Sequence, residues 1–477
     1  MIEPASTETD AESAPADTKT NPVASIKKKP RFNPNANHGR YGASDYTGCP
    51  VIEVPHDTLH PGSDCPSCTE VALSGRLTAV LPQVVVRLTG SPLVSGLRYE
   101  AQRLRCSLCQ EYYVAKLPEE VTRRGKYDET CRTNIAIAHY YAGQPFYRIE
   151  QLQAAQGIPL ADATQWDLMA QLYKILYPVY RLLETLAAQG TLLHYDDTGH
   201  RILQAYAPQD RKTVHTTAFI SHYEEHQIYL FFTSLNHAGE NIASLLGQRV
   251  TDEPLITMSD ASAQNIPKKV DEDLMARWIL CFCLVHGRRK FYELQHLWGK
   301  ECEAVLDIIA EVYKHEAHCK QHQLSPVERL RYHQIHSSTS MQALLIWLNN
   351  QLVHQQVEPN SALGQAIHYM LRHWKPLTRF LHVAGAPIDN SVCEQAIKVA
   401  IRYRRNSLFY KTYFGAKVGD TITSLIHTCA KNKINFFDYL NTLQRYYRES
   451  SEQPAQWLPW NYQATLAAMS KALPLAA

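Results

Sequence analysis

Two pairs of cysteines, Cys65 with Cys68 and Cys106 with Cys109, each have CxxC spacing. Together they resemble the ligand pattern of a zinc ribbon, although the gap between the pairs is longer than the commonest ribbon spacing. Four thiolates would hold one structural zinc ion with no open position. Disulfides are the less favoured alternative, because the other cysteines are scattered as in reduced cytosolic proteins. Whether the ribbon contacts DNA or protein does not follow from the spacing.

Three acidic residues have the surroundings of metal-binding carboxylates. Asp196 lies within an apolar segment, Asp260 directly follows another, and Glu394 lies early in a helical stretch. Carboxylates on strands and helices are held rigidly, and their oxygens bind hard divalent cations. Two such cations can support phosphoryl transfer on DNA. Each acid alone is most simply a solvated surface group, so the interpretation requires a fold that brings all three together.

The elements that would position the two aspartates have strand periodicity. Alternating or apolar runs predict strands at 192–206, 214–222, 227–235, 255–259 and 278–285, with a helix at 238–246. Three antiparallel strands, a helix and a further strand are the opening of a ribonuclease-H-like α/β core.

Helical segments flank this region. Residues 128–190 predict a helix, a turn at Gly157 and a second helix with Asp162 and Thr164 as cap candidates and Pro178 as a kink or break. This order is compatible with a DNA-binding helix-turn-helix, but also with an ordinary helical hairpin, which the pattern slightly favours. Apolar spacing between 292 and 381, with a capping box at 325–328, predicts an all-helical insertion before Glu394.

We therefore expect a multidomain α+β protein. Its predicted parts are a disordered basic arm (1–46), a β-rich zinc ribbon (47–120), a helical domain (121–190), a ribonuclease-H-like core in two parts (191–291 and 382–448) with its helical insertion (292–381), and a tail (449–477). The basic run 27–31 is either a solvated linker or a contact to DNA phosphates.

Overall composition excludes several classes. The formal net charge is +2 and the pI is near 7.9, so any nucleic-acid binding must depend on local basic clusters. No apolar stretch reaches the roughly 18 residues of a membrane span, and the amino terminus is unlike a signal peptide. A cytoplasmic protein is expected.

Several motifs resemble those of the insertion sequence 66 family of transposases. The segment 390–398 (NSVCEQAIK), with 404–409 (RRNSLF) and 424–426 (SLI), is similar to the family's terminal signature. The segments 196–198 (DDT) and 283–291 (CLVHGRRKF) are similar to two further family elements. The resemblance extends from about residue 34 to 460. It implies a ribonuclease-H-like core in which Asp196, Asp260 and Glu394 bind two magnesium or manganese ions.

The sequence departs from the family pattern at several positions. Asp197 stands where the family has Glu, Ala-Ser-Ala follows Asp260, Lys398 replaces a common Arg, and Ser407 a common Trp. None of these changes removes a metal ligand. Since adjacent strand residues face opposite sides of a sheet, only one of Asp196 and Asp197 can face the metals, and the family motif selects Asp196. The amino-terminal coiled coil of many relatives is absent.

Basic residues near the predicted acids are candidates for DNA contact. On the helix that carries Glu394 they share or adjoin one face, and after the strand at 278–285 they form a second group: Lys398, Arg402, Arg404, Arg405, His286, Arg288 and Arg289. A solvated Glu–Lys pair is the alternative for the first group, and a role in capping the strand end for the second.

The resemblance implies a bacterial transposase that frees 3′-hydroxyls at the ends of its element and joins them to target DNA. Its partners would be double-stranded DNA, further copies of itself on that DNA and possible accessory proteins of the element. Two alternatives stay open: a metal-dependent nuclease that does not join strands, and a zinc-ribbon regulator with a decayed catalytic core.

Overall fold

The computed structural model describes residues 51, 53–65, 75–80, 90–105, 107, 109, 112–123, 125–207, 210–211, 213–267 and 272–472. The chain divides into two units, Met1–Gly90 and Ser91–Ala477. In the first, the Cys65 N–H donates to the Gly75 carbonyl at 2.7 Å, and Asp64 forms an isolated antiparallel bridge with Arg76. The second CxxC lies between β1 (Arg103–Arg105) and β2 (Tyr112–Val114), an antiparallel pair of the second unit. The predicted ligands Cys68 and Cys106 and the predicted basic arm lie outside the described residues.

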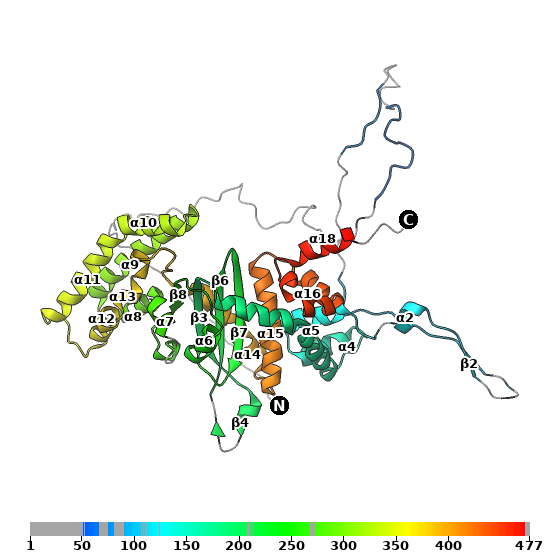
Figure 1. Cartoon of the computed structure of the whole chain (residues 1–477), viewed down its shortest axis with the longest axis horizontal. Helices are drawn as coiled ribbons and strands as arrows, with labels where there is room; N and C mark the ends of the chain where they lie inside the picture. Colours follow the sequence, from blue (N-terminus) through cyan, green and yellow to red (C-terminus); the bar gives the residue numbers. More distant parts are fainter. Residues whose placement is uncertain are drawn as a thin grey trace, which may run out of the picture. The chain divides into compact units, whose positions relative to one another are not determined.

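A five-stranded mixed sheet is the centre of the second unit (Figure 1). Its spatial order is β7-β6-β3-β8-β9, with β3, β6 and β7 antiparallel and β8 and β9 parallel to β3. The strands are β3 (Leu192–His200), β6 (Val214–Tyr223), β7 (His226–Ser234), β8 (Leu255–Ser259) and β9 (Trp278–Phe282). A short ribbon, β4 (Tyr206–Ala207) with β5 (Asp210–Arg211), and the turn η3 (Leu203–Ala205) follow β3.

Two strands are shorter than their apolar runs predicted. The strand predicted at 192–206 ends at His200, and the one predicted at 278–285 ends at Phe282. In the second case α8 (Leu284–Leu294) begins two residues later, with Cys283 as its N-cap. The apolar run continues through both elements because both are buried, and burial alone does not separate strand from helix.

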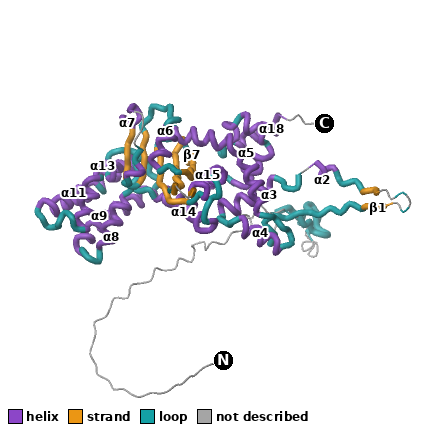
Figure 2. Tube along the Cα trace, turned by 90° about the horizontal axis from the view of Figure 1, so that it is seen from below, coloured by secondary structure: helices purple, strands orange, loops and turns teal. Residues whose placement is uncertain are grey.

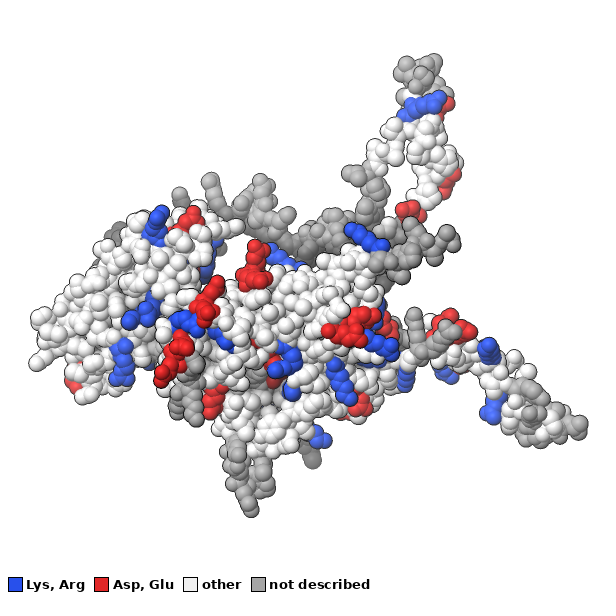
Figure 3. Space-filling model, in the orientation of Figure 1, with Lys and Arg blue, Asp and Glu red and all other residues white. Residues whose placement is uncertain are grey.

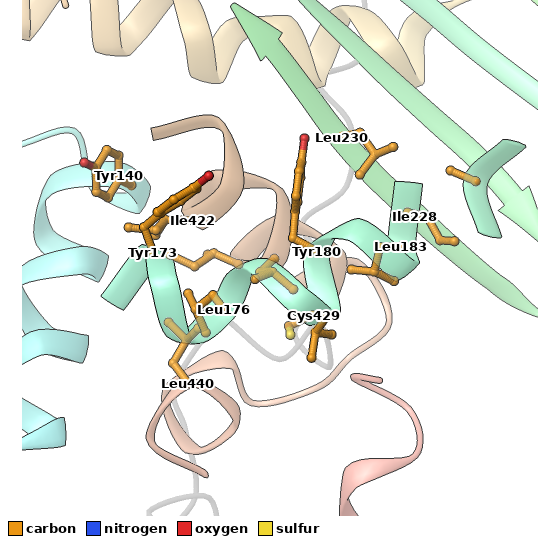
Figure 4. Packing of buried hydrophobic residues seen from close by; sticks show 14 of the residues in the cluster. Tyr140, Tyr173, Leu176, Tyr180, Leu183, Ile228, Leu230, Ile422, Cys429 and Leu440 are labelled. Atoms are coloured by element: carbon orange, nitrogen blue, oxygen red, sulfur yellow. The ribbon is translucent and has the colours of Figure 1, made fainter. Parts of the chain in front are cut away.

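One face of the sheet packs on long helices. The principal hydrophobic core joins Tyr195, Phe219 and Leu230 of the sheet to helices before and after it in the sequence. Figure 4 shows Ile228 and Leu230 of the sheet beside residues of these helices. These helices are α3 (Glu129–Ala136), α5 (Asp162–Ala188), α6 (Ala238–Leu246), α15 (Tyr413–Lys431) and α16 (Phe436–Arg445). The helices before β3 thus share a core with the sheet.

The predicted helical hairpin is present with different details. After α2 (Glu119–Arg123), helix α3 continues into a π-helical turn (Ile137–Tyr141), and α4 (Phe146–Ala155) is joined to α5 through Gly157, whose φ of +76° favours glycine. The predicted cap at Asp162 or Thr164 is wrong: Ala161 is the N-cap, and the Asp162 N–H donates to Glu150 at 3.2 Å. Pro178 does not end α5, which continues to Ala188. The buried residues of α5, which run along its whole length, pack in the core.

Helix α15 closes the outer edge of β7 through a row of polar side chains. Four α15 residues, spaced four apart, each accept the backbone N–H of one β7 residue. The four donors are every second residue of the strand. The acceptors are Asp420, Ser424, Thr428 and Asn432, and the donors are Thr233, Phe231, Tyr229 and Gln227 respectively, at 2.7 to 3.1 Å. An edge that would otherwise expose unpaired donors is therefore satisfied inside the chain.

Asp420 is the ionisable member of this row, and its titration gives a testable pH dependence. Burial raises its pKa to about 7, even though it accepts the Thr233 N–H and hydroxyl. Because the folded pKa lies above the unfolded value of about 3.9, the folded state binds the extra proton, and stability falls as pH rises from about 4 to about 7. Asn at this position can accept the Thr233 N–H with its oxygen and donate its amide to the Thr233 hydroxyl, without the charge. Asp420→Asn should raise the free energy of unfolding at pH 8 by about 1 to 4 kcal/mol, and by less at pH 5.

Urea unfolding at the two pH values measures this difference. Asp307→Asn, on an exposed position of α9 (Gly299–Gln321), is the matched control and should change neither value by more than about 0.5 kcal/mol. A destabilised Asp420→Asn protein at pH 8 would contradict the prediction.

The opposite face of the sheet is covered by α14 (Ser391–Ser407). Its buried residues Cys393, Ala396 and Ile397 pack on Ala218 of β6 and Phe231 of β7. Side chains alternate along each strand, so these positions face away from the core that holds Tyr195 and Phe219. The sheet is therefore a layer between α14 on one face and α5 and α6 on the other.

Between β9 and α14 the chain forms a helical bundle with a core of its own (Figure 2). This core includes Leu284 and Phe291 of α8 and is continuous with Phe282 at the end of β9. The predicted capping box is present, with Ser325 accepting the Glu328 N–H. The other elements are α10 (Pro326–His336), α11 (Ser338–Val353), α12 (Ala362–Arg372), α13 (Trp374–Leu377) and the turn η5 (Arg379–Leu381).

The remaining elements are short or terminal. They are the turn η4 (Ala263–Asn265) and α7 (Glu272–Arg277) before β9, and α17 (Tyr447–Glu452), the turn η6 (Pro454–Trp457) and α18 (Tyr462–Ala472) at the end of the described chain. Trp457 is fully buried in the principal core. Among the helices of the described residues, none combines the length and the apolar character that crossing a membrane requires.

Candidate active site

The register of two parallel strands places the two predicted aspartates at the same level. Leu192 of β3 pairs with Ile256 of β8, and His194 with Met258. Continued by two residues, this register sets Asp196 beside Asp260, the first residue after β8. Both carboxylates therefore lie near the carboxyl end of β8, on adjacent strands.

Glu394 approaches Asp196 from α14. Asp196 pairs across the sheet with Ala218, whose carbonyl accepts the Cys393 thiol at 3.5 Å. Ala218 and Cys393 share the small core beneath α14, so Asp196 faces the helix that carries Glu394. The sheet and this helix thus bring two residues close in space that are far apart in the chain.

The charges of the three acids act on one another. Burial and, after it, the negative charges of Asp260, Asp197 and Glu394 raise the pKa of Asp196 to about 7. Burial, Asp196 and Glu394 also raise the pKa of the adjacent Cys393 thiol. Repulsion of this kind raises the pKa of a carboxyl group that lies near other carboxylates.

The polar atoms of the three acids are held differently. One oxygen of Asp260 accepts the Ser262 N–H at 3.0 Å and the Asn265 amide. The loop that supplies these donors packs against α6 at Gly239, where a Cβ would lie 2.7 Å from the Gln264 carbonyl. In contrast, Glu394 Oε1 is buried and has no hydrogen-bond partner. Carboxylates near one another, one with an unused oxygen, are a donor set that fits a hard divalent cation.

Asp197 lies on the other face of β3. Its carboxylate accepts the Ala238 N–H at the start of α6 at 3.2 Å and lies 3.3 Å from His237 Nδ1. The side chain is 17% exposed. An acid at a helix N-terminus is stabilised by the unpaired N–H groups and the helix dipole. Asp197 therefore anchors α6 to β3.

Asn390 connects the elements that carry the acids, and sequence reasoning did not assign it a role. Its side chain donates to the Tyr195 carbonyl at 3.0 Å and lies 3.0 Å from His194 Nδ1, both on β3. Its N–H donates to Cys283 Sγ at 3.3 Å, and its carbonyl accepts the Glu394 N–H. The asparagine is only 1% exposed. The available signal was its place directly before the helix, where Asn is a common cap.

Asn390→Ala should therefore destabilise the protein and misplace Glu394. The truncation leaves the Tyr195 carbonyl and the His194 ring without their buried partner, which costs about 2 kcal/mol or more. Thermal unfolding should show the loss, and divalent-cation binding by the folded protein should weaken. The control is Asn349→Ala on α11, whose amide bonds only to its own helix and is exposed. Unchanged stability and cation binding in Asn390→Ala would show that it does not position Glu394.

The described residues contain three groups of possible metal ligands whose ligand atoms all lie within 4.8 Å of one another, and Asp196, Asp260 and Glu394 do not together form one of them. One joins Glu394 to Cys283 and His286, and another joins Asp197 to His215 and His237. The third is the buried set Glu316, Cys319 and His333. Burial would raise the pKa of Glu316, but the hydrogen bond from His333 and the charges of Arg329 and Lys320 lower it to about 2. The third group is thus a compensated ion-pair network.

The predicted DNA-binding residues are divided among exposed and tethered positions. On α14, Lys398, Arg402 and Arg405 are exposed and Arg404 is half-buried. Arg402 and Arg404 also donate to the carbonyls of Tyr141 and Gly199, respectively. The other three lie in α8: Arg289 is exposed, Arg288 is half-buried with its guanidinium 5.7 Å from the Tyr292 ring centre, and His286 is half-buried. They follow β9 as part of a helix, and not as a cap of the strand.

No single field of one sign dominates the view in Figure 3. Lys and Arg are interspersed with Asp and Glu over the face shown, as the net charge of +2 suggests. Any attraction of DNA to this face would therefore depend on local groups of basic side chains.

Comparisons with known proteins agree on one relationship. The family model described as "Transposase IS66 family" matches residues 124–418. Three uncharacterized proteins of Sinorhizobium fredii are similar over most of their length. The protein y4jD is 27% identical over 94% of this chain and 88% of its own, y4qI is 27% identical over 84% and 74%, and y4hP is 23% identical over 87% and 76%.

Proposed function

Since the chain belongs to the IS66 family of transposases, we propose that it is a DDE-type transposase that binds the ends of an insertion sequence, cleaves them to free 3′-hydroxyls and joins these to target DNA. The observation that carries this proposal is the strand register that sets Asp196 beside Asp260, with Asp196 facing the helix that carries Glu394. Such a group of acids is suited to a pair of divalent cations.

The arrangement of the strands supports a ribonuclease-H-like catalytic core. Three antiparallel strands are followed by a helix and two strands parallel to the first, and the first strand lies at the middle of the sheet. Helices α9 to α13, which lie within the predicted range 292–381, would be the all-helical insertion between Asp260 and Glu394. The domain boundaries given from the sequence are part of the same proposal.

Each group of side chains has a distinct task in this scheme. Asp196, Asp260 and Glu394 would hold two magnesium or manganese ions, which supply charge neutralisation at the attacking and leaving oxygens. Lys398 and Arg405, exposed on the helix of Glu394, and Arg289 on α8 would bind DNA phosphates. Asn390 holds the first turn of α14 against β3. The chain itself forms no covalent intermediate.

Two reactions on DNA phosphodiesters follow from these roles. In the first, the oxygen of a water molecule bonds to phosphorus while the bond to the 3′ oxygen breaks, which leaves a 3′-hydroxyl at the element end. In the second, that hydroxyl oxygen bonds to a phosphorus of the target strand and displaces the target's own 3′ oxygen. Both need the same site, because both develop negative charge on the same kind of centre.

Further parts of the proposal concern partners and location. The cysteines of the predicted ribbon would hold one zinc ion that stabilises a module outside the core. Double-stranded DNA would be the main partner, with several copies of the chain acting together on it, in the cytoplasm. Accessory proteins of the same element would be further partners.

The test uses duplex DNA that spans the junctions between the gene's own element and its flanking DNA, incubated with the protein and Mg²⁺ or Mn²⁺. Cleavage at the element ends and joined products in an added target duplex are expected. Cleavage without joining would favour a nuclease. Specific binding without cleavage would favour a regulator with a decayed core.

A further inference from the structure

The group that joins Cys283, His286 and Glu394 lies where two helices begin. Cys283 is the N-cap of α8, His286 lies in the first turn of α8, and Glu394 lies in the first turn of α14. Ligand atoms of the three lie within 4.8 Å of one another. The inference below rests on the proposed function, because it concerns the cation that Glu394 would hold.

Two atoms of this group are buried without partners. Glu394 Oε1 and His286 Nδ1 have almost no accessible surface and no hydrogen bond. They also make no hydrogen bond to each other, although the two residues belong to one close group. A buried polar atom without a partner costs about 1 to 3 kcal/mol of folding free energy. Two such atoms in residues of one close group therefore suggest a bound ion or molecule that interacts with both residues.

The third member of the group has other contacts. Cys283 Sγ accepts the Asn390 N–H at 3.3 Å and so helps to fix the start of α14. The side chains left to share a ligand are an imidazole and a carboxylate. Donors bound to one cation at about 2.0 to 2.2 Å lie about 3 to 4 Å apart, and the ligand atoms of this group lie within 4.8 Å of one another.

We propose that His286 is a nitrogen ligand of the divalent cation bound by Glu394. The cation site is then a mixed imidazole and carboxylate site, and not one of oxygen donors alone. Imidazole suits transition metals better than magnesium, which prefers oxygen. The site should consequently favour Mn²⁺ over Mg²⁺.

A different role for His286 is contact with a DNA phosphate. In that case its ring would bind no metal, and its replacement would weaken DNA binding without changing metal binding. Metal binding measured without DNA therefore separates the two roles.

The experiment is pulsed electron paramagnetic resonance of Mn²⁺ bound to the full chain in the absence of DNA, read for modulation by a directly bound imidazole ¹⁴N. The variant is His286→Gln, and the control is His296→Gln, an exposed histidine beyond the end of α8. We expect ¹⁴N modulation in the wild type and the control and none in His286→Gln. Mn²⁺ affinity should fall at least about tenfold in His286→Gln, and Mg²⁺ affinity by less.

Two results would overturn the inference: Mn²⁺ bound by the wild type without ¹⁴N modulation, or modulation that persists in His286→Gln. Circular dichroism checks that the variant is folded, and His286→Asn, which is smaller, replaces it if it is not. Failure of the proposed function has a separate signature. If the proposed function is wrong, Asp196→Asn and Glu394→Gln will leave Mn²⁺ binding intact, and the wild type will not cleave element ends.

Discussion

Strand cleavage and joining should fall at least about a thousandfold when Asp196, Asp260 or Glu394 is replaced by Asn or Gln. Each change removes one negative charge from the proposed cation site, and with it much of the affinity for divalent cations. Specific binding to element ends should be largely kept, because the exposed basic residues on α14 and α8 are unchanged. Gel-shift and cleavage assays on the same duplex measure the two properties side by side.

Asp197→Asn is the matched control for Asp196→Asn. The two residues are adjacent, but Asp197 faces the start of α6, where an amide oxygen can still accept the Ala238 N–H. We expect a modest loss of stability, about 1 kcal/mol, and a small loss of activity. If instead Asp197→Asn were inactive and Asp196→Asn active, the assignment of the metal-facing residue would be wrong. Full activity in all three single variants of Asp196, Asp260 and Glu394 would refute the proposal that these acids form the active site of an enzyme.

Loss of zinc is the second large effect that we expect. The purified protein should contain about one zinc ion per chain, and a Cys65→Ser/Cys106→Ser variant about none, because two thiolates cannot hold a closed tetrahedral site. Zinc binding by such sites is worth about 10 to 16 kcal/mol and is coupled to folding. A chelator should therefore expose the ribbon to proteolysis before the core. Plasma emission spectrometry of both proteins gives the metal content.

Ser67→Ala is a suitable control for this pair, because it alters the same CxxC without removing a thiolate. It should keep the zinc ion. Equal zinc contents in the wild type and the double cysteine variant would show that these cysteines are not the ligands.

The alternation of side chains predicted much of the sheet. Strands near β6, β7 and β8, and helix α6, were expected at 214–222, 227–235, 255–259 and 238–246, and the structure has them there within one residue. These segments bury one or both faces over a length typical of their element, so that their pattern is strong. The place of Asp196 on a strand and of Glu394 on a helix followed from the same patterns.

The other features of the fold and site depend on contacts between residues far apart in the sequence, and local sequence patterns do not reveal such contacts. The role of Asn390 depends on β3 and Cys283, both far away in the sequence. The N-cap of α5 was misplaced because the Asp162 N–H bonds to Glu150 of the preceding helix. Pro178 is tolerated inside α5, whose packing in the core offsets the lost hydrogen bond. The pairing of Asp197 with α6 likewise required the fold.

The polar row on α15 has a consequence for how copies of the chain can assemble. A helix rises about 6.0 Å over four residues, and a strand rises about 6.6 Å over two residues. The two repeats nearly match, so α15 can stay in step with β7 for a few repeats where the two run side by side. Over that length the helix occupies the place of a sixth strand. A second copy of the chain therefore cannot extend this sheet by β-augmentation at β7, and any contact that did extend the sheet would have to use its other edge, β9.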